Sequence, residues 1–230
     1  MPLLPTVFRI ASKVRGARAV HPRGIVMRAS WCPAGGSILS GSPLLAGRKP
    51  ALMRLSHGIG LPPSIPEVVG LAIKVLDVYG PGQDQDLVLI SSRRSYLGRR
   101  LILPGHDLAK VVMSSVLPYE VAGVGRRLIL ARARAGSPSV AYAEVIKGGP
   151  ERMPVFEVRL GRADGPMLAS LHAEEVVAPD LGESTCFNPW HTGPELQPRG
   201  VLNHIRRPTY PASQEGRGAP ADGWRQLDRT

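Results

Sequence analysis

Residues 153–177 read MPVFEVRLGRADGPMLASLHAEEVV, and this stretch decides the fold class. From Phe156 to Leu160 apolar side chains alternate with charged ones, which is the period-two pattern of a strand with one buried face. A second apolar run, residues 166–177, begins directly after Asp164-Gly165, a dipeptide that favours a tight hairpin turn. The stretch therefore predicts two antiparallel strands that pair as a hairpin.

The chain before this hairpin contains further short β-prone runs, separated by connections rich in Gly and Pro. These runs are GIVMRASW (24–31), PALMRLS (50–56), VVGLAIKVLDV (68–78), DLVLISS (86–92), RRLILARA (126–133) and SVAYAEVIK (139–147). Together with the hairpin they make roughly eight strands, which is enough to close a small barrel.

Two helices are expected beside the strands. Residues 106–118 (HDLAKVVMSSVLP) place Leu108, Val111, Val112 and Val116 at helical spacing, with Pro118 to end the helix. Residues 5–15 have the pattern of a short basic amphipathic helix. We interpret it as an arm packed on the barrel, in preference to a membrane-binding helix or part of a transit peptide.

The sequence predicts one domain over residues 1–230 and no internal repeat. A basic N-terminal arm (1–20) precedes the strands, a Pro- and Gly-rich segment (180–215) wraps the barrel, and a loose polar tail (216–230) follows. The expected fold class is mainly β (α+β): a closed antiparallel barrel with one inserted helix, an N-terminal helical arm and a C-terminal wrapping segment.

Charge and composition narrow the function classes. The formal net charge of +11 suits nucleic acid, an anionic membrane or the acidic groups of a cofactor. Aromatic residues are only 5%, and no RNP, zinc-finger or helix-turn-helix pattern is present, so nucleic acid is the less favoured partner. No apolar run approaches the roughly 18 residues that span a bilayer. Cys32 and Cys186 match no metal or redox spacing, which suggests reduced thiols in a cytoplasmic protein.

Two stretches near the N-terminus resemble the haem catalases. Arg18-Ala19-Val20-His21-Pro22-Arg23-Gly24 is similar to the R-V-V-H-A-K-G motif of that family. Arg54-Leu55-Ser56 is similar to the R-F-S motif, and residues 66–75 (PEVVGLAIKV) resemble the strand that follows it.

A further part of the resemblance lies later in the chain. Asp86-Leu87-Val88 falls where the family has W-D-L-V, and Phe187-Asn188-Pro189-Trp190 is similar to the start of F-D-x-x-x-x-W. Residues 198–210 are similar to P-V-G-x-L-V-L-N-R-N-P-x-N-Y. The motifs keep the family order from about residue 15 to residue 210, and the chain looks especially like the short actinobacterial members.

The resemblance implies roles for four residues. His21 is the distal catalytic base, Ser56 hydrogen-bonds it, and Arg18 and Arg54 contact the haem propionates. Since Arg54 and Ser56 are two apart on a strand, they share a face, which we expect to point inward around a cavity wide enough for a porphyrin. The alternative interpretation is a structural, hydrogen-bonded His21 and a structurally paired or solvent-facing Arg54.

The sequence departs from the family at the other groups that catalase chemistry needs. The peroxide-orienting Asn is replaced by the run from Leu89 to Ser92, in which Ile90 cannot hydrogen-bond and Ser91 serves only if it faces the site. His57 stands where the family usually has a small residue, and we expect its side chain at the pocket mouth.

The iron ligand is the larger departure. In the family a Tyr from a downstream helical R-x-F-x-Y-type segment binds the iron, and no tyrosine follows Tyr210, so that helix is expected to be absent. His172, His191 and His204 have no family warrant as replacements, and a histidine in such places is more often structural.

The sequence thus implies a haem-binding protein whose peroxide chemistry is weak or lost; any enzyme activity would be of catalase or peroxidase type. The alternative is a non-enzymatic barrel that binds haem weakly or another apolar or anionic small molecule. A third interpretation is a basic surface that docks on nucleic acid or anionic lipid. Some short relatives carry a phosphodiesterase label, but no His and Asp cluster at two-metal spacing supports it. The tetramer of full catalases is not carried over.

Overall fold

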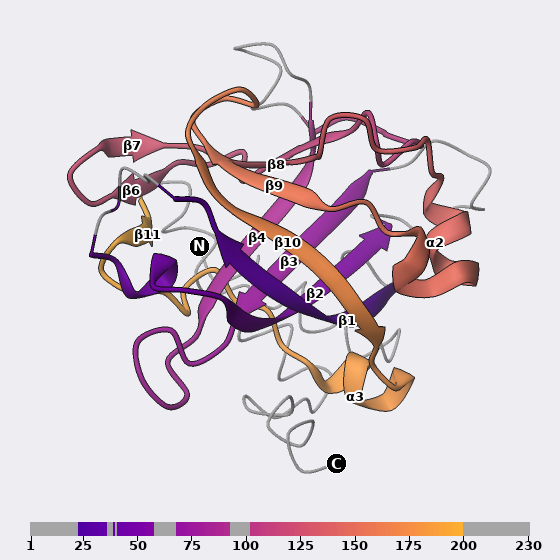
Figure 1. The fold of residues 1–230 in the computed structure, drawn as a ribbon, viewed down its shortest axis with the longest axis horizontal. Helices are drawn as coiled ribbons and strands as arrows, with labels where there is room; N and C mark the ends of the chain where they lie inside the picture. The colour runs from indigo at the N-terminus through magenta and orange to yellow at the C-terminus, as the bar shows by residue number, and fades with distance from the viewer. Residues whose placement is uncertain (1–22, 36–38, 40, 58–67, 93–101, 200–230) are drawn as a thin grey trace, which may run out of the picture.

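Eight strands close into one barrel. A computed structural model describes residues 23–35, 39, 41–57, 68–92 and 102–199, so the predicted arm (1–20) and tail (216–230) lie outside the described residues. The strand order around the barrel is β1-β10-β9-β8-β5-β4-β3-β2, and each neighbouring pair is antiparallel (Figure 1). The bounds are β1 Arg23–Pro33, β2 Lys49–His57, β3 Val69–Val75, β4 Gln85–Ser92, β5 Val112–Ser114, β8 Ile129–Ala133, β9 Phe156–Leu160 and β10 Met167–Val176. The predicted mainly β, closed antiparallel barrel is confirmed.

Smaller elements flank the barrel. A three-stranded sheet has the order β11-β6-β7. Figure 1 shows this sheet on the opposite side of the barrel from α2, while α3 lies near the ends of β1 and β10. The bounds are η1 Pro43–Leu45, β6 Tyr119–Val121, β7 Gly125–Arg127, α2 Tyr142–Gly148, η3 Gly149–Arg152, α3 Pro179–Ser184 and β11 Leu196–Pro198. No helix in the described ranges is long and apolar enough to cross a membrane.

The hairpin predicted from residues 153–177 is formed by β9 and β10. Its register pairs Arg159 with Met167 and Val158 with Ala169 across the turn. A Cβ at Gly165 would collide with the carbonyl oxygen of Leu160, so the turn requires glycine there. The Asp-Gly signal therefore located the turn correctly.

Two sequence predictions were wrong, and they exchange a helix for a strand. Residues 106–118 do not form a helix: Asp107 Oδ1 accepts the Ala109 amide at 2.9 Å in a short turn, and β5 follows. The strand predicted over 139–147 is instead helix α2, in which Glu144 Oε2 accepts the Ala141 amide at 2.6 Å. The inserted helix therefore exists, but it lies later in the chain.

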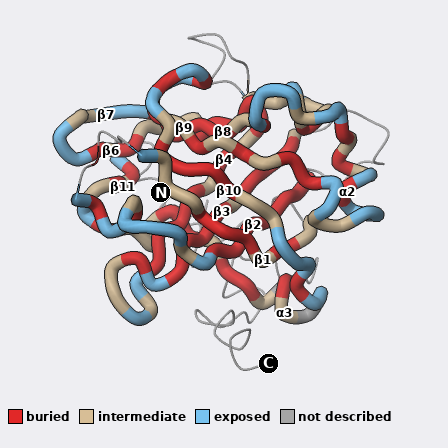
Figure 2. Tube along the Cα trace, in the orientation of Figure 1, coloured by how far each residue is buried: buried red, intermediate tan, exposed pale blue. Residues whose placement is uncertain are grey.

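Apolar side chains fill the interior of the barrel. One transverse row across β1, β2, β3 and β4 points inward and is fully buried; it consists of Met27, Met53, Ile73 and Leu87. Phe156 and Leu171 belong to the same buried cluster. Figure 2 shows buried backbone along the barrel strands and exposed backbone mainly at the turns. The interior is thus a packed core, as expected for an eight-stranded barrel.

Candidate ligand-binding face of the barrel

Arg54 and Ser56 share one face of β2, as predicted, but this is the outward face of the barrel. Met53 and Leu55 alternate with them and belong to the interior core. The expectation that Arg54 and Ser56 line a cavity inside the barrel is therefore wrong, because the core occupies that space. Both residues are nonetheless buried, at 3% and 4% exposure.

The outward face around Arg54 is largely apolar. Arg54 lies in a transverse row with Val26, Ala72 and Val88 on the neighbouring strands. The next row contains Gly24, Ser56, Gly70 and Ile90. Three of these eight positions are glycine or alanine, and Ala72, Val88 and Ile90 are only half-buried. Small and apolar residues therefore lie beside a buried guanidinium.

Gly24 makes room for the Arg54 side chain. A Cβ at residue 24 would lie 2.8 Å from Arg54 Cζ and 2.7 Å from the carbonyl oxygen of Leu55. The guanidinium consequently lies against the backbone at the beginning of β1. Arg18 and His21 precede β1 and lie outside the described residues, so their roles stay predictions. Ser56 Oγ donates to the Gly70 carbonyl oxygen at 3.4 Å, a long hydrogen bond.

The structure shows on which face each of the two candidates for the peroxide-orienting position, Ile90 and Ser91, lies. Ile90 pairs with Gly70 and lies on the face of Arg54, whereas Ser91 points the other way. Ser91 Oγ donates to the Leu103 carbonyl oxygen and accepts the Val69 amide at 3.0 Å. Neither residue therefore offers a hydrogen bond on the face of Arg54.

His57 packs under a helix. It lies at the end of β2, and its ring stacks on Tyr142 of α2 with the ring centroids 3.7 Å apart and the planes at 25°. At 4% exposure it is part of the barrel's closed end beneath α2, so its predicted position at a pocket mouth is wrong.

A buried ion pair anchors the wrapping segment to the barrel. Lys74 Nζ donates to both oxygens of Asp86, at 2.7 and 2.9 Å, on the same outward face. Asp86 Oδ2 also accepts the Asn188 amide at 2.7 Å, and the Asp86 amide donates to the His191 carbonyl oxygen at 2.8 Å. Two stretches of the resemblance, 86–88 and 187–190, thus contact each other. The described part of this segment, up to residue 199, therefore contacts the barrel at Asp86.

Apolar contacts cover the neighbouring part of the same face. Val26 and Leu52 on the barrel form a cluster with Leu76 and Val177, and Leu181 of α3 and Phe187 pack against it. This cover explains why Leu52, an outward-facing residue of β2, is as buried as the core.

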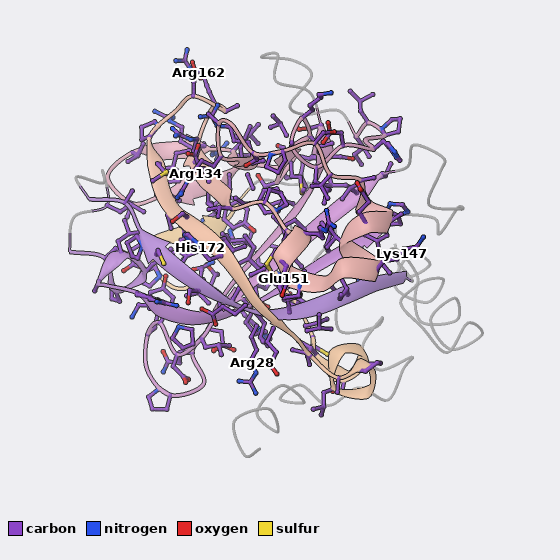
Figure 3. The ribbon with its side chains drawn as sticks, turned by 45° about the vertical axis from the view of Figure 1, so that its right-hand side comes forward. Arg28, Arg134, Lys147, Glu151, Arg162 and His172 are labelled. Atoms are coloured by element: carbon purple, nitrogen blue, oxygen red, sulfur yellow. The ribbon has the colours of Figure 1, made fainter. Side chains whose placement is uncertain are left out.

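The histidines considered as iron ligands lie elsewhere or outside the described residues. His172 is on the outer side of β10, with Nε2 at 3.0 Å from Ser170 Oγ. Burial, and then the positive charges of Arg134 and Arg48, lower the pKa of His172. Figure 3 shows Arg134 and His172 on the same side of the molecule. His191 Nδ1 is 3.5 Å from Asp86 Oδ2, and His204 falls outside the described residues.

The sequence reasoning missed the buried charges. The sequence nevertheless contains a signal for them, which is a lysine inside the otherwise apolar run VGLAIKV (69–75). Because a buried lysine requires an acidic partner, this lysine could have predicted a buried ion pair. Within the described ranges no three His, Cys, Asp or Glu side chains are grouped so that they could hold a metal ion.

Comparison with known proteins supports the fold. No protein-family model matches the sequence, and no curated protein matches it either. Among solved structures, the crystal structure of a fungal catalase superposes with a TM-score of 0.60 at 10% identity, over 92% of this chain and 60% of that catalase. The chain thus spans about 60% of the length of the catalase it matches. At this identity the likeness concerns architecture alone: the chain has a catalase-like barrel fold.

Proposed function

We propose that this protein binds haem on the outward face of β1 to β4 and turns over peroxide poorly. The observation that carries the proposal is the buried Arg54 guanidinium, whose neighbours on the outward face include the small residues Gly24, Gly70 and Ala72. A porphyrin is a flat apolar ring with carboxylates at one edge, and this surface offers a matching partner for each part.

The residues of this chain fit haem at one edge. Arg54 would pair a propionate in two-point fashion, since a guanidinium presents its donors in a planar fork. His21 is two residues before Arg23, the first residue of β1, and would take a proton from peroxide and return it. Bound haem would supply the iron that reacts with peroxide.

Poor turnover follows from what the face lacks. Ile90 occupies a position on the face of Arg54 and cannot orient peroxide. Two of the three tyrosines in the described ranges have side-chain contacts elsewhere: Tyr79 donates to Gln85, and Tyr142 stacks on His57, while Tyr119 lies in β6 of the small sheet. These features favour the second candidate, a non-enzymatic protein that holds haem or another flat apolar carboxylate.

The test begins with the protein purified with haem supplied, followed by its absorption spectrum and peroxide consumption. We expect a Soret band with little turnover. Ile90→Asn should raise turnover because it adds an amide on the face of Arg54, whereas the matched control Ser91→Asn should not. Absence of bound haem under every loading condition would refute the proposal. Vigorous turnover that is lost in His21→Ala would refute the non-enzymatic alternative.

A further inference from the structure

A polar pocket of about 520 Å³ lies between the β3–β4 turn and the segment that leads to β11. Its volume falls within the range of about 300–1,000 Å³ that is typical of small-molecule sites. The lining includes two aromatic residues, Tyr79 and Trp190, two amides, Gln83 and Gln197, and the carboxylate of Asp84. None of the described lining residues is Lys or Arg, although the chain has a net charge of +11.

Asp84 places an incompletely compensated negative charge in the pocket wall. It is 7% exposed, and Oδ1 accepts the Asp77 amide at 3.0 Å. Lys74 Nζ is 3.5 Å from Asp84 Oδ2 but 2.7 Å from Asp86 Oδ1, so one lysine serves two buried carboxylates and lies closer to the other one. Burial raises the pKa of Asp84 despite these contacts, which indicates that its charge is poorly stabilised.

A second carboxylate lies nearby. Glu195 Oε2 is buried and has no hydrogen-bond partner among the described residues. Burial, and then the charge of Glu195, raise the pKa of the Tyr79 phenol, which therefore stays neutral and donates to Gln85 Oε1 at 3.0 Å. The negative charge of Glu195 therefore acts on Tyr79, which is one of the pocket-lining residues.

We propose that this pocket binds a small organic ammonium cation, with the ammonium group beside Asp84 and the aromatic Trp190. The carboxylate supplies charge attraction, and aromatic side chains attract cations through their ring faces. The amides of Gln83 and Gln197 can hydrogen-bond a hydroxyl group on the same molecule. This site is separate from the Arg54 face, so it does not depend on haem binding.

Two other ligand classes fit the pocket less well. A metal ion would need several oxygen or nitrogen ligands together, and the described residues provide no group of three. An anion would meet the carboxylate of Asp84, and no Lys or Arg is among the described lining residues. Since the whole chain is strongly basic, a cation gains no general attraction to its surface. Binding of a cation therefore reports a specific site.

The experiment is calorimetric titration of the full chain at low salt with choline, ethanolamine and 3,3-dimethylbutan-1-ol, the neutral isostere of choline. Choline and ethanolamine distinguish a quaternary from a primary ammonium group. We expect at least one of these cations to bind about tenfold more tightly than the neutral alcohol. If neither cation bound more tightly than the neutral alcohol, or if neither cation bound at all, the proposal would be overturned.

Single-residue variants test whether the cation binds in this pocket. Asp84→Asn should weaken cation binding about tenfold, whereas Asp164→Asn, which removes an exposed carboxylate in the β9–β10 turn, should change nothing. Because Asp84 is buried, Asn there could disturb folding. Gln83, which is exposed in the lining, provides a second test: Gln83→Glu should tighten and Gln83→Lys should weaken cation binding, each severalfold. Unchanged affinity in both Gln83 variants would contradict the assignment.

Discussion

The substitution Lys74→Met removes a buried cation. Among the described residues, Lys74 is the only one whose side-chain nitrogen donates a hydrogen bond to Asp86. Lys74 is 1% exposed and Asp86 is fully buried, so the substitution leaves an uncompensated charge in the protein. Breaking a buried pair in this way typically costs about 3–5 kcal/mol. That is a large part of the roughly 5–15 kcal/mol by which domains of this kind are stable.

Urea unfolding measures this prediction, with Lys110→Met as the control. Lys110 also pairs with an aspartate, at 3.2 Å from Asp107 Oδ2, but its side chain is 81% exposed, and such pairs contribute about 0–1 kcal/mol. If Lys74→Met cost no more than Lys110→Met, the account of a buried anchor for the wrapping segment would be refuted.

Three further predictions concern single side chains. Gly24→Ala should displace Arg54 and cost about 1–3 kcal/mol in urea unfolding, with weaker haem affinity in titration; an unchanged midpoint would contradict the close contact. Gly193→Ala should collide with the Tyr79 ring and cost a similar amount in urea unfolding, and an unchanged midpoint would contradict that contact. Burial opposes ionisation of Glu157, but its two arginine partners lower its pKa below the usual 4.5. Glu157→Gln should therefore destabilise at neutral pH, and its cost should shrink as pH falls to about 3; a constant cost would contradict this linkage.

Local signals predicted the parts of the fold that local chemistry controls. The β9–β10 hairpin follows from alternation and from the turn at Gly165. The exchange of helix and strand shows where this reasoning fails. Short apolar runs such as VVMSSV (111–116) fit both periods, and pairing of β5 with β4 and β8 decides between them. Such long-range pairing is not visible in a window of the sequence.

The candidate site was predictable in composition but not in orientation. Period two placed Arg54 and Ser56 on one face. It could not say which face, because every residue of β2 from Ala51 to His57 is buried. A strand covered on both sides shows no contrast between inside and outside. Likewise, the Lys74 and Asp86 pair depends on the register between β3 and β4.

The most direct test of the central claim compares haem with its propionate dimethyl ester as ligands of the intact protein and of Arg54→Met. If Arg54 on the outward face pairs a propionate, the protein should prefer the free acid by about 10- to 100-fold, and Arg54→Met should lose most of that preference. Equal affinity for the acid and the ester, or the same preference with and without Arg54, would contradict the account.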